Sequence, residues 1–125
     1  MAERPAYYPY QAPIDAYGDG GFRFADMSHR GSILCLPSGI YAWHISSPDQ
    51  LDVSAFTQVF ADKDRIEFLL LGTGRRQIFP SPELRNAFAE AGLGLEPMDT
   101  GAACRTYNVL LAEQRRVAAA LIAVD

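Results

Sequence analysis

The stretch Arg65-Ile66-Glu67-Phe68-Leu69-Leu70-Leu71-Gly72-Thr73-Gly74-Arg75-Arg76 decides the fold of this chain. Its apolar run from Phe68 to Leu71 stops at Gly-Thr-Gly. A short apolar run closed by a turn signal is typical of a strand buried on both faces, which needs helices above and below it. In open α/β sheets, ligands bind in the loops that follow such strands. The stretch therefore predicts an architecture and also a candidate site.

Strand and helix patterns alternate around this stretch. Residues 32–36 and 40–45 are apolar runs separated by a Pro/Gly turn, which predicts an antiparallel hairpin. The other expected elements are a half-exposed strand at 22–24, a helix near 53–60, a helix from Pro82 to Ala91, a strand at 95–98, a helix from about residue 100 and an apolar strand at 117–124. This order predicts a single three-layer α/β domain: a central mixed β-sheet flanked by helices, with an N-terminal β-hairpin region.

Residues 1–12 differ from the rest of the chain. They contain two prolines and the tyrosines Tyr7, Tyr8 and Tyr10, without apolar periodicity. Such a segment has little to bury, so we expect a flexible N-terminal arm (1–12) before the α/β domain (13–125). The alternative is an aromatic docking peptide.

Length and composition narrow the function classes. At 125 residues the chain is one domain by length, and its net charge of −4 disfavours nucleic-acid binding, which needs a basic face. No apolar run approaches the roughly 20 residues of a transmembrane helix, and the N-terminus resembles neither a signal nor a transit peptide. Two cysteines, Cys35 and Cys104, fit a reducing compartment. We therefore expect a cytoplasmic protein.

Two loops are expected to meet at one edge of the sheet. The first follows the central strand and the second opens the helix near residue 100. If the strands before them are parallel neighbours, a helix N-terminus with small residues and three nearby arginines could bind a small anion. The candidate ligand-binding residues are Gly72, Thr73, Gly74, Arg75, Arg76, Thr100, Gly101, Ala102, Cys104 and Arg105. The alternative is a tight turn with close helix–sheet packing, because Gly-Thr-Gly lacks the spacing of a dinucleotide fingerprint or a P-loop.

No catalytic or metal-binding group stands out in the sequence. Asp99-Thr100-Gly101 spells the aspartic-protease triplet, but here it precedes a helix, so Asp99 or Thr100 is expected as the helix cap. Cys104 in the first helical turn could be a nucleophile only with a base nearby. His29 and His44 are the two histidines, and nothing in the sequence places either beside Cys104. We expect a buried, inert cysteine, no metal and no cofactor.

Four segments resemble a known family: Leu69-Leu70-Leu71-Gly72-Thr73-Gly74, Pro82-Glu83-Leu84-Arg85, Met98-Asp99-Thr100-Gly101-Ala102-Ala103-Cys104-Arg105-Thr106-Tyr107-Asn108 and Val117-Ala118-Ala119-Ala120-Leu121-Ile122. They look like a small bacterial and archaeal domain of unknown function that is shared with mitochondrial NADH dehydrogenase (complex I) assembly factor three and with an adipogenesis-associated protein. The resemblance covers about residues 13–124. It implies a three-layer α/β fold and, for the mitochondrial members, a role in respiratory-complex assembly. It transfers no catalytic residue.

Two functional hypotheses follow. The first is a non-enzymatic interaction or assembly module whose partner is a respiratory-complex subunit or another assembly factor. The alternative is a protein that binds a small anion, or an enzyme, using the loop at Gly72–Gly74 and the helix start at Gly101–Arg105. The oligomeric state stays open at this point.

Overall fold

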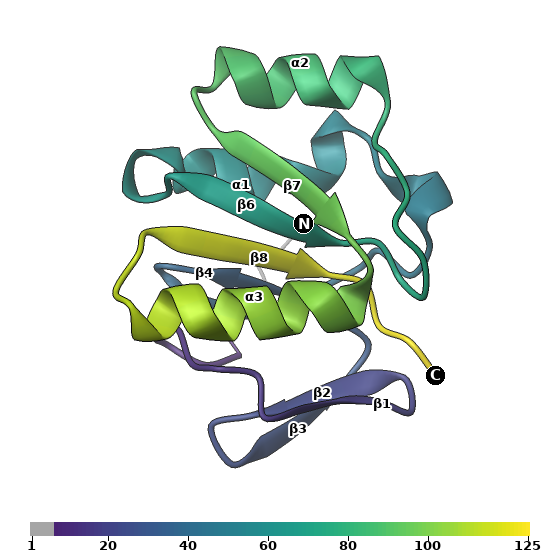
Figure 1. Ribbon diagram of the computed structural model, residues 1–125, viewed down its shortest axis with the longest axis vertical. Helices are drawn as coiled ribbons and strands as arrows, with labels where there is room; N and C mark the ends of the chain where they lie inside the picture. Colours follow the sequence, from purple (N-terminus) through teal and green to yellow (C-terminus); the bar gives the residue numbers. More distant parts are fainter. Residues whose placement is uncertain (1–6) are drawn as a thin grey trace.

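The computed structural model describes residues 7–125 and arranges them in three layers around a central sheet (Figure 1). The strands are β1 (Ala16–Gly18), β2 (Gly21–Phe24), β3 (Met27–Arg30), β4 (Ser32–Leu36), β5 (Gly39–Trp43), β6 (Phe68–Gly72), β7 (Gly94–Met98) and β8 (Val117–Leu121). The helices are α1 (Thr57–Ala61), α2 (Pro82–Glu90) and α3 (Thr100–Ala112), with short 3-10 turns η1 (Pro48–Gln50), η2 (Val53–Phe56) and η3 (Lys63–Arg65). The predicted α/β class and three-layer architecture are confirmed.

The central sheet is mixed, as predicted. Its strand order is β5-β4-β8-β6-β7. The strand β6 runs parallel to both β7 and β8, whereas β4 is antiparallel to β5 and β8. The apolar stretch of the sequence is thus an inner strand with partners on both sides, which explains why every one of its leucines is buried.

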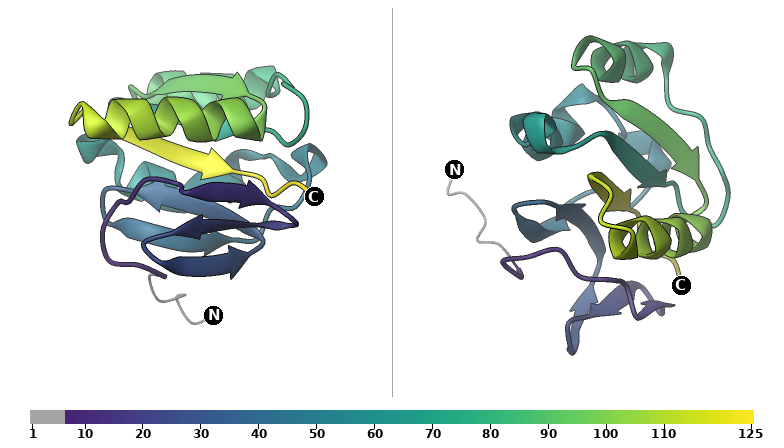
Figure 2. Two further views of the ribbon diagram at one scale, coloured as in Figure 1. Left: turned by 60° about the horizontal axis from the view of Figure 1, so that its bottom comes forward. Right: turned by 60° about the vertical axis from the view of Figure 1, so that its left-hand side comes forward.

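Each face of the central sheet has its own hydrophobic core. Leu69 and Leu71 point to the face covered by α1 and α2, where Phe56 and Phe88 pack edge to face with ring centroids 5.2 Å apart. Leu70 points to the opposite face, where α3, β2 and the segment with Ala12 and Ile14 cover it. Figure 2 shows these two coverings on either side of the sheet. Because successive side chains of a strand point to opposite faces of the sheet, one apolar run contributes to both cores.

The segment before β4 forms a separate three-stranded antiparallel sheet, β1-β2-β3. The strand β3 was not predicted. It follows β2 through a two-residue turn at Ala25 and Asp26, whose φ angles of 49° and 62° are positive. Such hairpin turns normally carry Asn-Gly or Asp-Gly, so Ala-Asp gave no turn signal in the sequence.

The predicted flexible arm is wrong for residues 7–12. Tyr8 pairs with Ile40, and the two residues exchange backbone hydrogen bonds of 3.0 and 2.8 Å. Ala12 is buried, and its carbonyl oxygen accepts a hydrogen bond from the Tyr107 hydroxyl at 3.0 Å. These contacts are made with distant residues, so the lack of local periodicity concealed them. The rest of the predicted arm, residues 1–6, lies outside the described residues.

Candidate functional site

The two predicted loops meet at the carboxyl ends of β6 and β7, which are parallel neighbours. The backbone N–H of Gly74 donates to the Thr100 hydroxyl at 3.0 Å, and the N–H of Thr100 donates to the Gly74 carbonyl at 2.8 Å. The Thr100 hydroxyl in turn donates to the Ile122 carbonyl beyond β8 at 2.7 Å. One buried threonine therefore connects the ends of three strands.

Gly72 is required by this close approach. A Cβ atom at Gly72 would lie 3.0 Å from both Cα and Oγ1 of Thr100. That distance is shorter than ordinary van der Waals contact, so a side chain would push the start of α3 away from β6. The first glycine of Gly-Thr-Gly therefore has a packing role, as the alternative interpretation of the motif expected.

Backbone N–H groups at the N-terminus of α3 already donate hydrogen bonds to acceptors within the protein. Asp99 is the N-cap: its carboxylate accepts from the N–H of Ala102 at 2.9 Å, and its carbonyl accepts from the N–H of Ala103 at 2.9 Å. A Cβ atom at Gly101 would collide with the hydroxyl of Tyr17. The N–H groups of Ala102 and Ala103, which were expected to bind an anion, thus already donate hydrogen bonds to Asp99. The hydroxyl of Tyr17 also covers Gly101.

The three arginines of the candidate site face different surroundings. Arg75 and Arg76 line a depression of about 370 Å³ between the loop after β6, the turn at Ser46–Pro48 and the last residues of the chain. Arg75 Nη2 lies 3.4 Å from the carbonyl oxygen of Asp125. Arg105 is not part of this lining; its guanidinium lies near Gly101. The geometry therefore supplies no single cavity into which all three converge, and the anion site stays a prediction from the sequence.

Cys104 is buried rather than presented to a ligand. Its side chain is buried in the core, and the pKa of its thiol is raised to about 12, mainly by burial, with Arg105 opposing the rise and Asp99 contributing to it. Burial also raises the pKa of Cys35, which faces Tyr107 in the same core. Both cysteines are free thiols. A thiol held protonated in a core is a poor nucleophile, so this geometry agrees with the expected inert cysteine.

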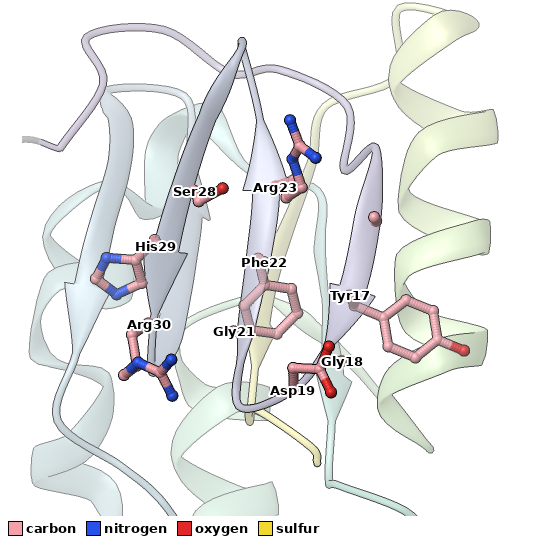
Figure 3. A pocket seen from close by; sticks show the side chains of 10 residues that line it. Tyr17, Gly18, Asp19, Gly21, Phe22, Arg23, Ser28, His29 and Arg30 are labelled. Carbon is pink, nitrogen blue, oxygen red and sulfur yellow. The ribbon is translucent and has the colours of Figure 1, made fainter.

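The outer three-stranded sheet carries a second depression, of about 410 Å³, that sequence reasoning did not anticipate. Figure 3 shows Arg23 and Arg30 at its opposite ends and Tyr17 pointing toward α3. His29 is partly buried here, and this burial lowers its pKa. These residues belong to three short strands that are separate in the sequence, and only the pairing of β1, β2 and β3 brings them together.

A second feature missed in the sequence is the segment 75–79 between β6 and α2. All five of its residues are exposed, although Gly74 and Pro80 on either side are buried. Phe79 keeps 71% of its surface accessible and Ile78 keeps 41%. The signal was present: two adjacent apolar residues in a connection that belongs to neither strand nor helix pattern.

Within residues 7–125, no group of three or more His, Cys, Asp or Glu side chains is placed to hold a metal ion. The same part of the chain contains no helix that is long and apolar enough to cross a membrane.

Comparison with known proteins identifies the family. Residues 14–122 match the model of a family described as a protein of unknown function (DUF498/DUF598). The chain belongs to this family. The match spans both sheets and all three α-helices, so the family domain is the whole α/β unit described above.

Named relatives fall into two groups. The chain is 30% identical over 115 residues to NADH dehydrogenase [ubiquinone] 1 alpha subcomplex assembly factor 3 of Mus musculus, covering 92% of this chain and 62% of that protein. It is 36% identical over 122 residues to an uncharacterized protein of Rhodobacter capsulatus, covering 98% and 93% of the two chains. The chain therefore spans about three fifths of the length of the mouse assembly factor.

A solved structure shares the fold closely. It is the crystal structure of a protein from Bartonella henselae that is called an outer membrane protein, and it is 52% identical, with a TM-score of 0.92 over 95% of this chain and 100% of that one. A solution structure from Rhodopseudomonas palustris is 43% identical, with a TM-score of 0.84 over 100% and 91%. Both structures therefore share the architecture described here.

Proposed function

We propose that this chain is a non-enzymatic interaction module that assists assembly of a respiratory NADH dehydrogenase. The observation that carries the proposal is the 30% identity to a complex I assembly factor over 92% of the chain. The alignment covers nearly the whole folded unit, so the relationship concerns the α/β domain itself.

The geometry of the candidate site supports a binding role over catalysis. The thiol of Cys104 is buried with a raised pKa, and Thr100 is committed to internal hydrogen bonds. The N-terminus of α3 is capped by Asp99. These residues of the loop junction contribute to packing of the strand ends, which is the role of a scaffold that presents other surfaces to a partner.

The proposed place of action is the cytoplasmic face of the membrane that holds the respiratory complex. Free thiols at Cys35 and Cys104 fit a reducing compartment. A module that meets a membrane-bound complex from the cytoplasm is consistent with these free thiols.

Deletion of the gene in the native host, followed by native gels of membrane extracts, tests the proposal. We expect less fully assembled NADH dehydrogenase, accumulation of partial complexes, and recovery when the wild-type chain is restored. Affinity capture of the tagged chain should enrich subunits of the same complex, with the tag alone as the control. Normal assembly in the deletion strain, together with no enrichment of these subunits, would contradict the proposal.

A further inference from the structure

We infer that residues 75–79 form a docking loop for a membrane surface rich in anionic lipid headgroups. The inference rests on the proposed function, because a module that serves a membrane-bound complex must work close to lipid. In Figure 1 this loop connects the end of β6 to α2 on the side of the molecule where the C-terminus lies. The segment is defined by two features, the exposed charged residues Arg75 and Arg76 and the exposed apolar residues Ile78 and Phe79.

The loop is fixed in place rather than merely exposed. The buried hydroxyl of Thr73 donates to the carbonyl oxygen of Arg76 and accepts from the N–H of Ile78 at 3.0 Å, while the backbone N–H of Thr73 donates to the Met98 carbonyl at 2.9 Å. The Gln77 amide donates to the Pro97 carbonyl on β7 at 2.9 Å. These bonds hold the backbone against the sheet while Phe79 stays 71% exposed. An anchored loop loses little conformational entropy when it binds, which favours association.

The charge of the loop complements anionic headgroups. Between Gly74 and Ser81 the chain has two arginines and no acidic residue, although the protein as a whole carries a net charge of −4. The nearest carboxylate that follows along the chain is Glu83 in α2. Arginines at a membrane surface are attracted by its negative potential, and each adds to the affinity when it lies within a Debye length of the headgroups. The segment itself is therefore basic on an acidic molecule, and Asp125 is the acidic residue that lines the same depression as its two arginines.

The exposed apolar area of Ile78 and Phe79 favours a lipid surface as the binding partner over a stable protein–protein interface. Ile78 and Phe79 together expose on the order of 200 Å², whereas each side of a typical protein–protein interface contributes about 800 Å². Two apolar side chains beside two arginines match the pattern of peripheral attachment, in which shallow insertion and headgroup contacts act together. This combination gives weak, reversible binding.

Co-sedimentation of the purified full-length chain with vesicles tests the inference. The vesicles are phosphatidylcholine with or without phosphatidylglycerol. We expect binding only to the anionic vesicles, and weaker binding as salt is added, because salt screens exposed charges. The double variant Arg75→Gln/Arg76→Gln should bind roughly tenfold more weakly or worse. Ile78→Ser/Phe79→Ser should lose at least about tenfold as well, whereas Phe79→Trp should bind as well as wild type or better, since Trp favours the membrane interface.

Matched controls come from other faces of the molecule. Val109 on α3 is 57% exposed, so Val109→Ser removes an exposed apolar side chain on another face. Arg23→Gln/Arg30→Gln on the outer sheet removes the same charge as the loop variant. Both controls should bind vesicles like wild type, and thermal melts should show that every variant is folded.

Two results would overturn the inference. The first is no binding of the wild-type chain to anionic vesicles, and the second is equal loss of binding in the loop variants and their controls. If vesicles are not bound but the loop variants lose captured subunits, the loop docks a protein instead, which also refutes the lipid assignment. The vesicle assay contains no other protein, so its failure leaves the assembly function standing, and failure of subunit capture leaves the vesicle result standing.

Discussion

Substitution of Thr100 tests whether one buried hydroxyl holds the strand ends together. Thr100→Val keeps the shape of the side chain but removes the hydroxyl. The buried N–H of Gly74 then loses its acceptor and the carbonyl of Ile122 loses its donor. Each of the two unsatisfied buried groups costs about 1–3 kcal/mol, so the free energy of unfolding should fall by about 2–6 kcal/mol. Thr100→Ser keeps both hydrogen bonds and removes one methyl group, which should cost about 1 kcal/mol.

Urea unfolding of the wild type and both variants measures this difference. The midpoint of Thr100→Val should fall further than that of Thr100→Ser with no change in the m-value, because the surface exposed on unfolding stays the same. Native-state hydrogen exchange should also show faster exchange at the Gly74 amide in the valine variant alone. The reasoning is refuted if Thr100→Val costs less than about 1 kcal/mol, or if the serine variant is the less stable of the two.

Four further predictions follow from the core and the loop junction. Leu70→Ala should lower the free energy of unfolding by about 2–5 kcal/mol in denaturant melts, because Leu70 is 1% exposed in the core under α3; a loss below about 0.5 kcal/mol would place β6 at the periphery. Tyr107→Phe should lower the free energy of unfolding by about 1–3 kcal/mol, because the Ala12 carbonyl loses its donor. Removal of residues 1–12 should likewise lower the melting temperature by more than about 8 °C. An unchanged melting temperature in both proteins would instead support a flexible arm. At pH 8 the Cys104 thiol, with its pKa raised to about 12, should react with a disulfide reagent at least about tenfold more slowly in the folded chain than in urea, and equal rates would mean that the thiol is accessible. Phosphate, citrate and chloride at equal ionic strength should shift the melting temperature equally, because Asp99 already caps the helix; selective stabilisation by phosphate would instead support the anion site.

The sequence by itself determined the central part of the fold. The apolar run at Leu69–Leu71 required a sheet covered on both faces, and the caps Ser81 and Asp99 marked the starts of α2 and α3. These features are local: an unbroken apolar run, a Ser-Pro step and an Asp before a helix each express their structure within a few residues. The meeting of the loops after β6 and β7 was expected from the sequence on the condition that the two strands are parallel neighbours, and their pairing in the sheet meets that condition.

The tertiary structure decided what lies over the predicted site and where the chain is exposed. Tyr17 covers Gly101 across more than eighty residues of sequence, and Tyr107 anchors Ala12 across a similar separation. Such contacts leave no local pattern, because they depend on how separate elements pack and not on the propensity of either one. The same is true of Phe79. An apolar residue in a loop looks the same in the sequence whether it is buried or exposed, and only the tertiary structure shows that Phe79 is exposed.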